Sequence, residues 1–232
     1  MTRPHAHDAT PQPTLGSGDR PDPRIDTPAA RLAAALTATE ASDRMQAALT
    51  AGTAADPAFL EPLLERCAVE PDFFVRDMLT WAICALPREL TVPRLLGEVE
   101  SATAQARSQA LHTLSKIGDP ETRSAVRPAH LHDEDAEVRR AAWRTAVGLA
   151  VAGAVPEAEL VDLAVELSPE LGRGDLELQR SLSRALVELG DAARGPVIGA
   201  TLAEDRAVRM HARATLRLLD DPEAGFYLDP QD

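Results

Sequence analysis

Aromatic residues are scarce in this sequence. Its 232 residues include only four Phe, two Trp and one Tyr, although 44% of them are hydrophobic. Most of these are Ala, Leu and Val. β-Rich cores draw on aromatic and β-branched side chains, so this composition favours closely packed helices. We therefore expect an almost entirely helical protein, long enough to bury a sizeable core.

Cysteines and long apolar runs are also few. Cys67 and Cys84 each lie among apolar residues in helical segments, as expected of reduced thiols in a cytoplasmic core. The longest apolar run, 146–155, is too short to span a bilayer, and the first residues do not resemble a targeting signal. We expect a cytoplasmic protein that does not enter a membrane.

The formal net charge of −13 disfavours, taken over the whole chain, binding to nucleic acid or to an anionic membrane. Residues 1–27 are rich in Pro and lack apolar periodicity, so we predict a disordered N-terminal tail. His5 and His7 fall in this tail, and we interpret them as incidental rather than as metal ligands.

A period of about 30 residues organises the rest of the chain, with one wider spacing of about 40. The aligned segments start at Asp72, Thr103, Asp135, Asp175 and Asp205. If the fourth residue of each segment is position 0, positions 0, 4, 8 and 11 are apolar in all five. These positions share one stripe of a helix, so each segment is predicted to be a helix capped by its first residue.

Weaker amphipathic stretches lie between these segments and are predicted to form partner helices. They span 57–69, 92–101, 120–130, 156–167 and 192–202, and most begin at or beside a proline. The wider spacing is assigned to a linker over 151–155 and a longer helix after it. Residues 29–54 are predicted to be an atypical N-terminal pair, because Asp43 falls at position 0. The repeats then cover 28–222, and the tail 223–232 is expected to fold back over the last one.

The run ALHTLSKIGDPETRSAVRPAHLHDEDAEVRRAAWRTAV, residues 110–147, resembles the HEAT repeat. The short period is similar to that of the HEAT-like repeats of phycobilisome lyases. The resemblance implies an all-α fold, an α-α superhelix (solenoid) of about six two-helix repeats. Members of the family serve as adaptors, assembly factors, chromophore lyases, an iron-dependent hydroxylase and DNA-alkylation glycosylases.

The catalytic branches of the family are poorly matched. The hydroxylase branch carries His-Glu pairs, and no His is followed by Glu here. The run from His130 to Asp135, HLHDED, is the nearest metal-like cluster, but we interpret it as a turn between helices. Trp81 and Asp77 are similar to the glycosylase pattern, which the pI of about 4.9 weakens. Nothing identifies a tetrapyrrole substrate.

The capped helices should line the inner face of the superhelix, as second helices do in this family. Positions 2 and 6 would then face solvent. Position 2 is occupied by Asp77, Ser108, Arg140, Arg180 and Met210, and position 6 by Trp81, His112, Arg144, Arg184 and Ala214. The capped helices are net basic and the partner segments net acidic. We predict a partner-binding face made of Trp81, His112, Arg140, Arg144, Arg180 and Arg184.

Two interpretations of this face stay open. The arginines either grip an acidic partner or pair within their own helices with Asp77, Glu137, Glu177 and Glu188. Trp81 is either exposed or packed against the preceding helix. The residues at position 1 are expected to hydrogen-bond the capping Asp of an adjacent repeat; they are Arg76, Arg107, Arg139, Gln179 and Arg209.

The sequence therefore favours a monomeric, non-enzymatic scaffold or adaptor that binds a protein or an acidic peptide. We expect no catalytic residue, cofactor or metal, because no Ser-His-Asp or Cys-His arrangement is recoverable from the sequence. The alternatives are a DNA-binding or glycosylase-like HEAT-repeat protein and a lyase-like HEAT-repeat enzyme.

Overall fold

A computed structural model describes residues 27–229, and within this range the chain is all-helical with no strand. The predicted disordered tail lies outside the described residues, except for Thr27. The Thr27 side chain caps the first helix by accepting the backbone N–H of Ala30 at 3.1 Å. The last three residues of the predicted C-terminal tail are likewise outside the range.

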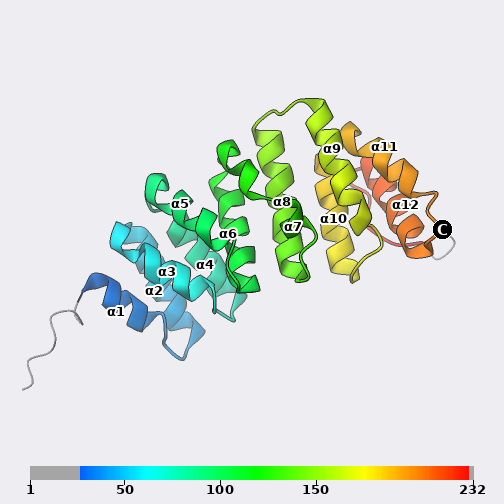
Figure 1. Cartoon of the computed structure of the whole chain (residues 1–232). Helices are drawn as coiled ribbons and strands as arrows, with labels where there is room; N and C mark the ends of the chain where they lie inside the picture. The colour runs from blue at the N-terminus through cyan, green and yellow to red at the C-terminus, as the bar shows by residue number, and fades with distance from the viewer. Residues whose placement is uncertain (1–26, 230–232) are drawn as a thin grey trace, which may run out of the picture.

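One row of helices contains the five predicted capped segments and the helix before them (Figure 1). The row consists of α2 (Ala41–Ala54), α4 (Phe73–Cys84), α6 (Ala104–Ile117), α8 (Ala136–Ala152), α10 (Leu176–Glu188) and α12 (Arg206–Asp220). Each of these helices packs against the next one in the row.

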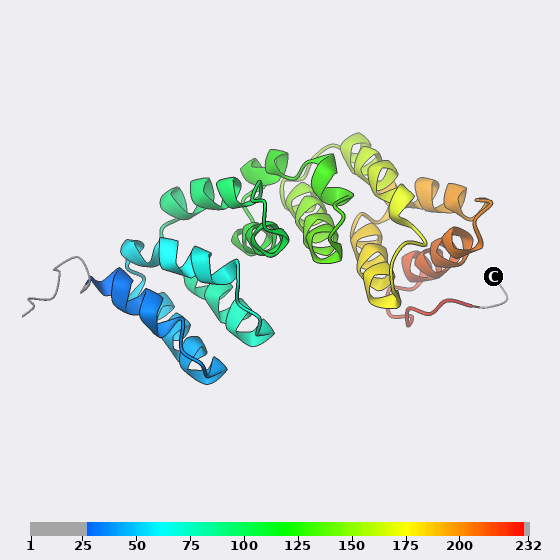
Figure 2. The ribbon, with the colours of Figure 1, turned by 60° about the horizontal axis from the view of Figure 1, so that its bottom comes forward.

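Shorter helices form a second row. They are α1 (Pro28–Ala35), α3 (Leu60–Cys67), α5 (Arg88–Glu98), α7 (Pro128–Leu131), α9 (Glu157–Leu167) and α11 (Asp191–Ala200), with 3-10 helices η1 (Pro57–Phe59), η2 (Pro120–Ala125) and η3 (Ser168–Glu170). Figure 2 shows that the two-row array is bowed and that the row from α2 to α12 lies on its concave side.

The predicted caps and buried stripe account for the long row. Asp72, Asp135, Asp175 and Asp205 each accept a backbone N–H of their helix, whereas the Thr103 side chain makes no such bond. The twenty apolar stripe residues are buried except for three in α12, which are partly exposed; these are Val208, Leu216 and Leu219. Since α12 ends the row, no further helix covers it.

One local prediction was wrong and another was confirmed only in part. Residues 120–130 do not form one α-helix, because η2 ends at Ala125 and α7 starts only at Pro128. A proline forces the residue before it into an extended conformation, and Arg127 has φ −94° and ψ 161°. The wider spacing was predicted in part. It comes from α8, which has 17 residues, and from η3, which follows α9 directly and extends the helical stretch after 155 to residue 170. The loop that follows η3, residues 171–175, is no longer than the loop 99–103.

The loop that follows η3 depends on Gly172. Its φ is +80°, and a Cβ at this position would lie 2.7 Å from the backbone N of Val208. Glycine is therefore required at position 172 for two reasons: its positive φ and the close approach of the α12 backbone.

The position 1 side chains join each helix to the loop before it. Each donates hydrogen bonds to two backbone carbonyls in that loop, five to seven residues earlier. This is true of Arg76, Arg107, Arg139, Gln179 and Arg209. Arg44 of α2 makes the same two bonds, to Ala38 and Thr39, so the N-terminal pair is in register with the rest.

Three of these arginines also reach the next repeat, but the expected acceptor was wrong. They pair with a carboxylate that precedes the capping Asp rather than with the cap itself; the pairs are Arg44–Glu70, Arg107–Asp133 and Arg139–Glu170. Glu70 and Asp133 in turn accept the backbone N–H of the cap residue, each at 2.9 Å. We call these three ion pairs the ladder, since they tie successive repeats together. Arg44–Glu70 and Arg107–Asp133 are also hydrogen-bonded, whereas Arg139 Nε and Glu170 Oε2 are 3.5 Å apart and form an ion pair only.

Glu70 shows the chemistry of this ladder. Its side chain is fully buried and accepts hydrogen bonds from Arg44 at 2.9 and 2.8 Å and from Arg66 at 2.6 Å. Burial opposes ionisation, but these bonds and the one from the Asp72 amide outweigh it and lower the pKa of Glu70 to about 2. The carboxylate is therefore charged throughout the neutral range.

Candidate functional site

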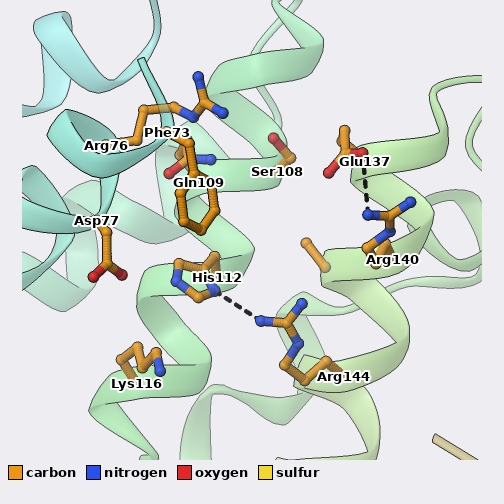
Figure 3. A pocket seen from close by; sticks show the side chains of 11 residues that line it. Phe73, Arg76, Asp77, Ser108, Gln109, His112, Lys116, Glu137, Arg140 and Arg144 are labelled. Atoms are coloured by element: carbon orange, nitrogen blue, oxygen red, sulfur yellow. Dashed lines mark hydrogen bonds and ion pairs between the residues drawn. The ribbon is translucent and has the colours of Figure 1, made fainter. Parts of the chain in front are cut away.

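A hollow of about 320 Å³ lies on the concave side between α4, α6 and α8 (Figure 3). We call it the basic hollow. It is lined by Phe73, Arg76 and Asp77 of α4, Ser108, Gln109, His112 and Lys116 of α6, and Glu137, Arg140, Ala141 and Arg144 of α8.

Three of the six predicted partner-binding residues meet in this hollow. His112, Arg140 and Arg144 point into it because positions 2 and 6 lie opposite the buried stripe. The expectation that all such positions face solvent was wrong for two of them. Ser108 and Ala214 are buried, at 5% and 2% exposed, since a small side chain at a helix contact is easily covered by its neighbours.

The basic side chains of the hollow differ in whether they are neutralised. Arg76 donates to the backbone carbonyls of Glu70 and Pro71, and Arg140 pairs with Glu137 of the same helix at 3.5 Å. Lys116 and Arg144 are both exposed. Within the described part of the chain, neither has a carboxylate oxygen within 4.0 Å. Two uncompensated positive charges therefore face the hollow.

His112 is a neutral hydrogen-bond acceptor in the hollow and does not neutralise the charges of Lys116 and Arg144. The Arg144 guanidinium lies with Nη1 3.2 Å from His112 Nδ1 and can only donate, so Nδ1 is the unprotonated acceptor. Burial, followed by the charges of Arg144 and Lys116, lowers the pKa of His112 to about 4. The imidazole is neutral at pH 7, and the hollow keeps its positive potential.

Trp81 is both partly exposed and packed against the preceding helix of its row, α2. Its side chain is 46% exposed, yet its ring lies directly on Gly52 of α2, where an added Cβ would be 2.3 Å from Cζ3. Trp81 does not line the basic hollow. Phe73 does, at 65% exposed, with its ring edge-on to that of Phe74 at 5.6 Å.

The sequence prediction missed Phe73 and Phe74. A signal was present, because Phe73 falls two positions before the stripe of α4, on the side away from the core. Phe73 lies four residues before Asp77 at position 2, one turn earlier on the same side of α4.

Arg180 and Arg184 lie in a second hollow, of about 550 Å³, between α10 and the residues after α12. Arg180 pairs with Glu177 of its own helix at 2.9 Å. Arg184 is exposed and, among residues 27–229, has no carboxylate oxygen within 4.0 Å. The four predicted arginines are thus divided between two hollows. Intrahelical pairing holds for Arg140 and Arg180, and not for Arg144 and Arg184.

The structure also brings together Ser183 and His211, with Oγ and Nε2 2.9 Å apart. The Gly172 N–H donates to His211 Nδ1 at 2.9 Å, so the proton of the neutral ring is on Nε2 and is donated to Ser183. Ser183 then donates to Thr215 Oγ1, which donates to the His211 carbonyl. His211 cannot take the Ser183 proton in this arrangement, and both side chains are fully buried. The pair is structural.

His132, Asp133 and Asp135 of the HLHDED turn each have hydrogen-bond partners within the fold. His132 lies between two carboxylates, with Nδ1 2.7 Å from Glu170 and Nε2 3.1 Å from Glu166. Asp133 belongs to the ladder, and Asp135 caps α8. Over residues 27–229, no three His, Cys, Asp or Glu side chains are grouped so that they could hold a metal ion.

The two cysteines are unpaired, Cys67 buried and Cys84 partly buried. Burial raises the pKa of Cys67 to about 12, so this thiol is protonated and unreactive at neutral pH. None of the helices in the described range has the length and apolar character needed to cross a membrane.

Comparison with protein-family models finds no match, and comparison with curated proteins finds none either. Any functional conclusion therefore depends on the geometry of the two hollows and of the face that carries them.

Proposed function

We propose that this chain is a HEAT-like α-α superhelix that acts as a non-enzymatic scaffold or adaptor, and that it binds an acidic segment of a partner protein in the basic hollow. The short repeat, the two helical rows and the ladder between repeats support this architecture.

One observation carries the proposed activity. Among the described residues, Lys116 and Arg144 face the same hollow with no carboxylate oxygen within 4.0 Å of either. They lie beside a neutral His112 and an exposed Phe73. An acidic side chain of a partner would supply the missing counter-charge, and Arg144 offers a bidentate donor for it. An apolar or aromatic neighbour on the partner would cover Phe73, an exposed aromatic of the kind that anchors interfaces.

An acidic protein segment fits this hollow better than a nucleic acid does. Asp77 and Glu137 also line it, and they would repel the closely spaced phosphates of a nucleic acid backbone. A peptide can place its few carboxylates next to Lys116 and Arg144 and turn other side chains toward the two acids.

Paired variants with equal charge change test the proposal. Lys116→Gln with Arg144→Gln should reduce recovery of the partner in co-purification at least tenfold, because both uncompensated charges are removed. Arg123→Gln with Arg127→Gln is the control. These arginines lie on the other row and pair with Glu159 and Glu100, so partner recovery should be unchanged.

Equal recovery with both double variants would refute the basic hollow as the binding site. Duplex DNA that binds the wild-type chain with a steep salt dependence, and loses binding in the hollow variant, would instead favour the DNA-binding alternative.

A further inference from the structure

After α12 the chain turns at residues 222–224 and then runs back along the concave face without regular secondary structure (Figure 2). We call residues 221–229 the C-terminal strap. The ring of Phe226 lies edge-on to buried His211, with 5.7 Å between ring centroids. Arg217 of α12 lies 4.3 Å above the Tyr227 ring, and its Nη2 donates to the Tyr227 carbonyl at 2.7 Å.

The strap covers the same face that carries the basic hollow. It forms one wall of the second hollow, whose other wall carries Arg180 and Arg184. These arginines occupy positions 2 and 6 of α10, the positions that Arg140 and Arg144 occupy in α8. The strap therefore leaves the concave face open at α4 to α8, whereas at α10 to α12 it walls the hollow beside Arg180 and Arg184.

The chemistry of the strap is that of the ligand expected for this face. The strap, DPEAGFYLD, is acidic, with Asp221, Glu223 and Asp229 around the adjacent aromatics Phe226 and Tyr227. Its contacts with α12 include the edge-on ring pair of Phe226 with His211 and the Arg217 side chain at Tyr227. Tyr227 remains 54% exposed, whereas Phe226 is partly buried.

Resting on the proposed function, we infer that this face recognises an extended acidic segment with adjacent aromatic residues, and that the C-terminal strap is an internal copy of that ligand. A partner segment of the same chemistry displaces the strap. A strap tethered directly to α12 acts at an effective concentration of about millimolar, so it weakens binding of any competitor that must displace it.

The probe is a fluorescein-labelled peptide of residues 220–229, whose binding is followed by fluorescence anisotropy. Two variants remove the strap from the concave face in different ways. One is the full-length chain with Phe226→Ala and Tyr227→Ala, and the other is a chain that ends at Asp221. Both retain Arg217, Arg180 and Arg184, and circular dichroism checks that each is folded.

Both released chains should bind the peptide at least tenfold more tightly than the wild-type chain, because the tethered competitor is gone. Adding Arg217→Ala to either should abolish the gain, and a peptide with alanine at both aromatic positions should not bind. Equal affinity for the wild-type and released chains, or no binding to the released chains, would overturn the inference.

This outcome is separate from that of the proposed function. Lys116 and Arg144 line the other hollow, so the strap inference can fail while their double variant still loses the partner. If that double variant retains the partner, the proposed function fails whatever the peptide does.

Discussion

Replacing Glu70 by Ala should destabilise the fold far more than removing a surface carboxylate. Glu70 is fully buried and pairs with Arg44, whose side chain is 8% exposed. It also accepts from Arg66 and from the Asp72 amide. The variant leaves the Arg44 guanidinium in the core with only its two carbonyl acceptors.

The magnitude follows from the burial of the pair. Removing one partner of a buried ion pair costs about 3–5 kcal/mol, because the other charge stays desolvated. Glu61 offers a matched control, since it also makes two hydrogen bonds to one arginine, Arg94, at 2.7 and 2.9 Å. That pair is 55% and 41% exposed, so Glu61→Ala should cost about 1 kcal/mol or less.

Urea unfolding followed by far-UV circular dichroism measures both variants. At about 2–4 °C per kcal/mol for a chain of this size, the melting temperatures of the two should also differ by about 10 °C. If Glu70→Ala lowers the free energy of unfolding no more than Glu61→Ala does, the ladder does not join the repeats as described.

Three further predictions concern histidines and glycines. Burial lowers the pKa of His211 to about 4, while an unfolded His titrates near 6.5, so the unfolded state binds the extra proton and the stability of the fold falls as the pH drops from about 6.5 to 4. The expected loss is about 3 kcal/mol. Thermal melts across this pH range measure it, and a melting temperature that does not change with pH would contradict the prediction. Binding of an acidic ligand should raise the pKa of His112 above 4, so His112 should take up a proton on binding at pH 5. Calorimetric titration of the ligand in two buffers of different ionisation enthalpy measures this uptake, and identical binding heats in the two buffers would exclude it. Gly52→Ala should displace the Trp81 ring, change its fluorescence and lower the free energy of unfolding by about 1–3 kcal/mol. Gly195→Ala is the control and should be neutral or stabilising, because a Cβ added there has no neighbour within 4 Å. Equal unfolding midpoints for the two variants would argue against the contact between Trp81 and Gly52.

The sequence predicted the long row of helices well, because two independent signals coincide there. The buried stripe repeats every turn, and an Asp opens most segments with a side chain that can cap the helix. The interruption at 126–127 falls inside the one helix that the amphipathic pattern predicts over 120–130. A proline that starts one helix also ends the preceding one.

The candidate site was predicted only in part. Helical position alone brought His112, Arg140 and Arg144 to one hollow, since neighbouring helices keep the same register. It could not show that Arg140 is paired and Arg144 is not, because that depends on side-chain conformation at distances below 4 Å. The strap was expected to fold back, but its contact with Arg217 and its place beside Arg184 depend on tertiary packing.

The central claim is that a partner segment lies in the basic hollow, and site-specific photo-crosslinking tests it most directly. A benzoylphenylalanine in place of Gln109 would sit in the hollow, and one in place of Leu96 would sit on α5, in the other row. We expect the co-purified partner to crosslink from residue 109 and not from residue 96. Crosslinking from residue 96 alone, or equally from both, would contradict the account.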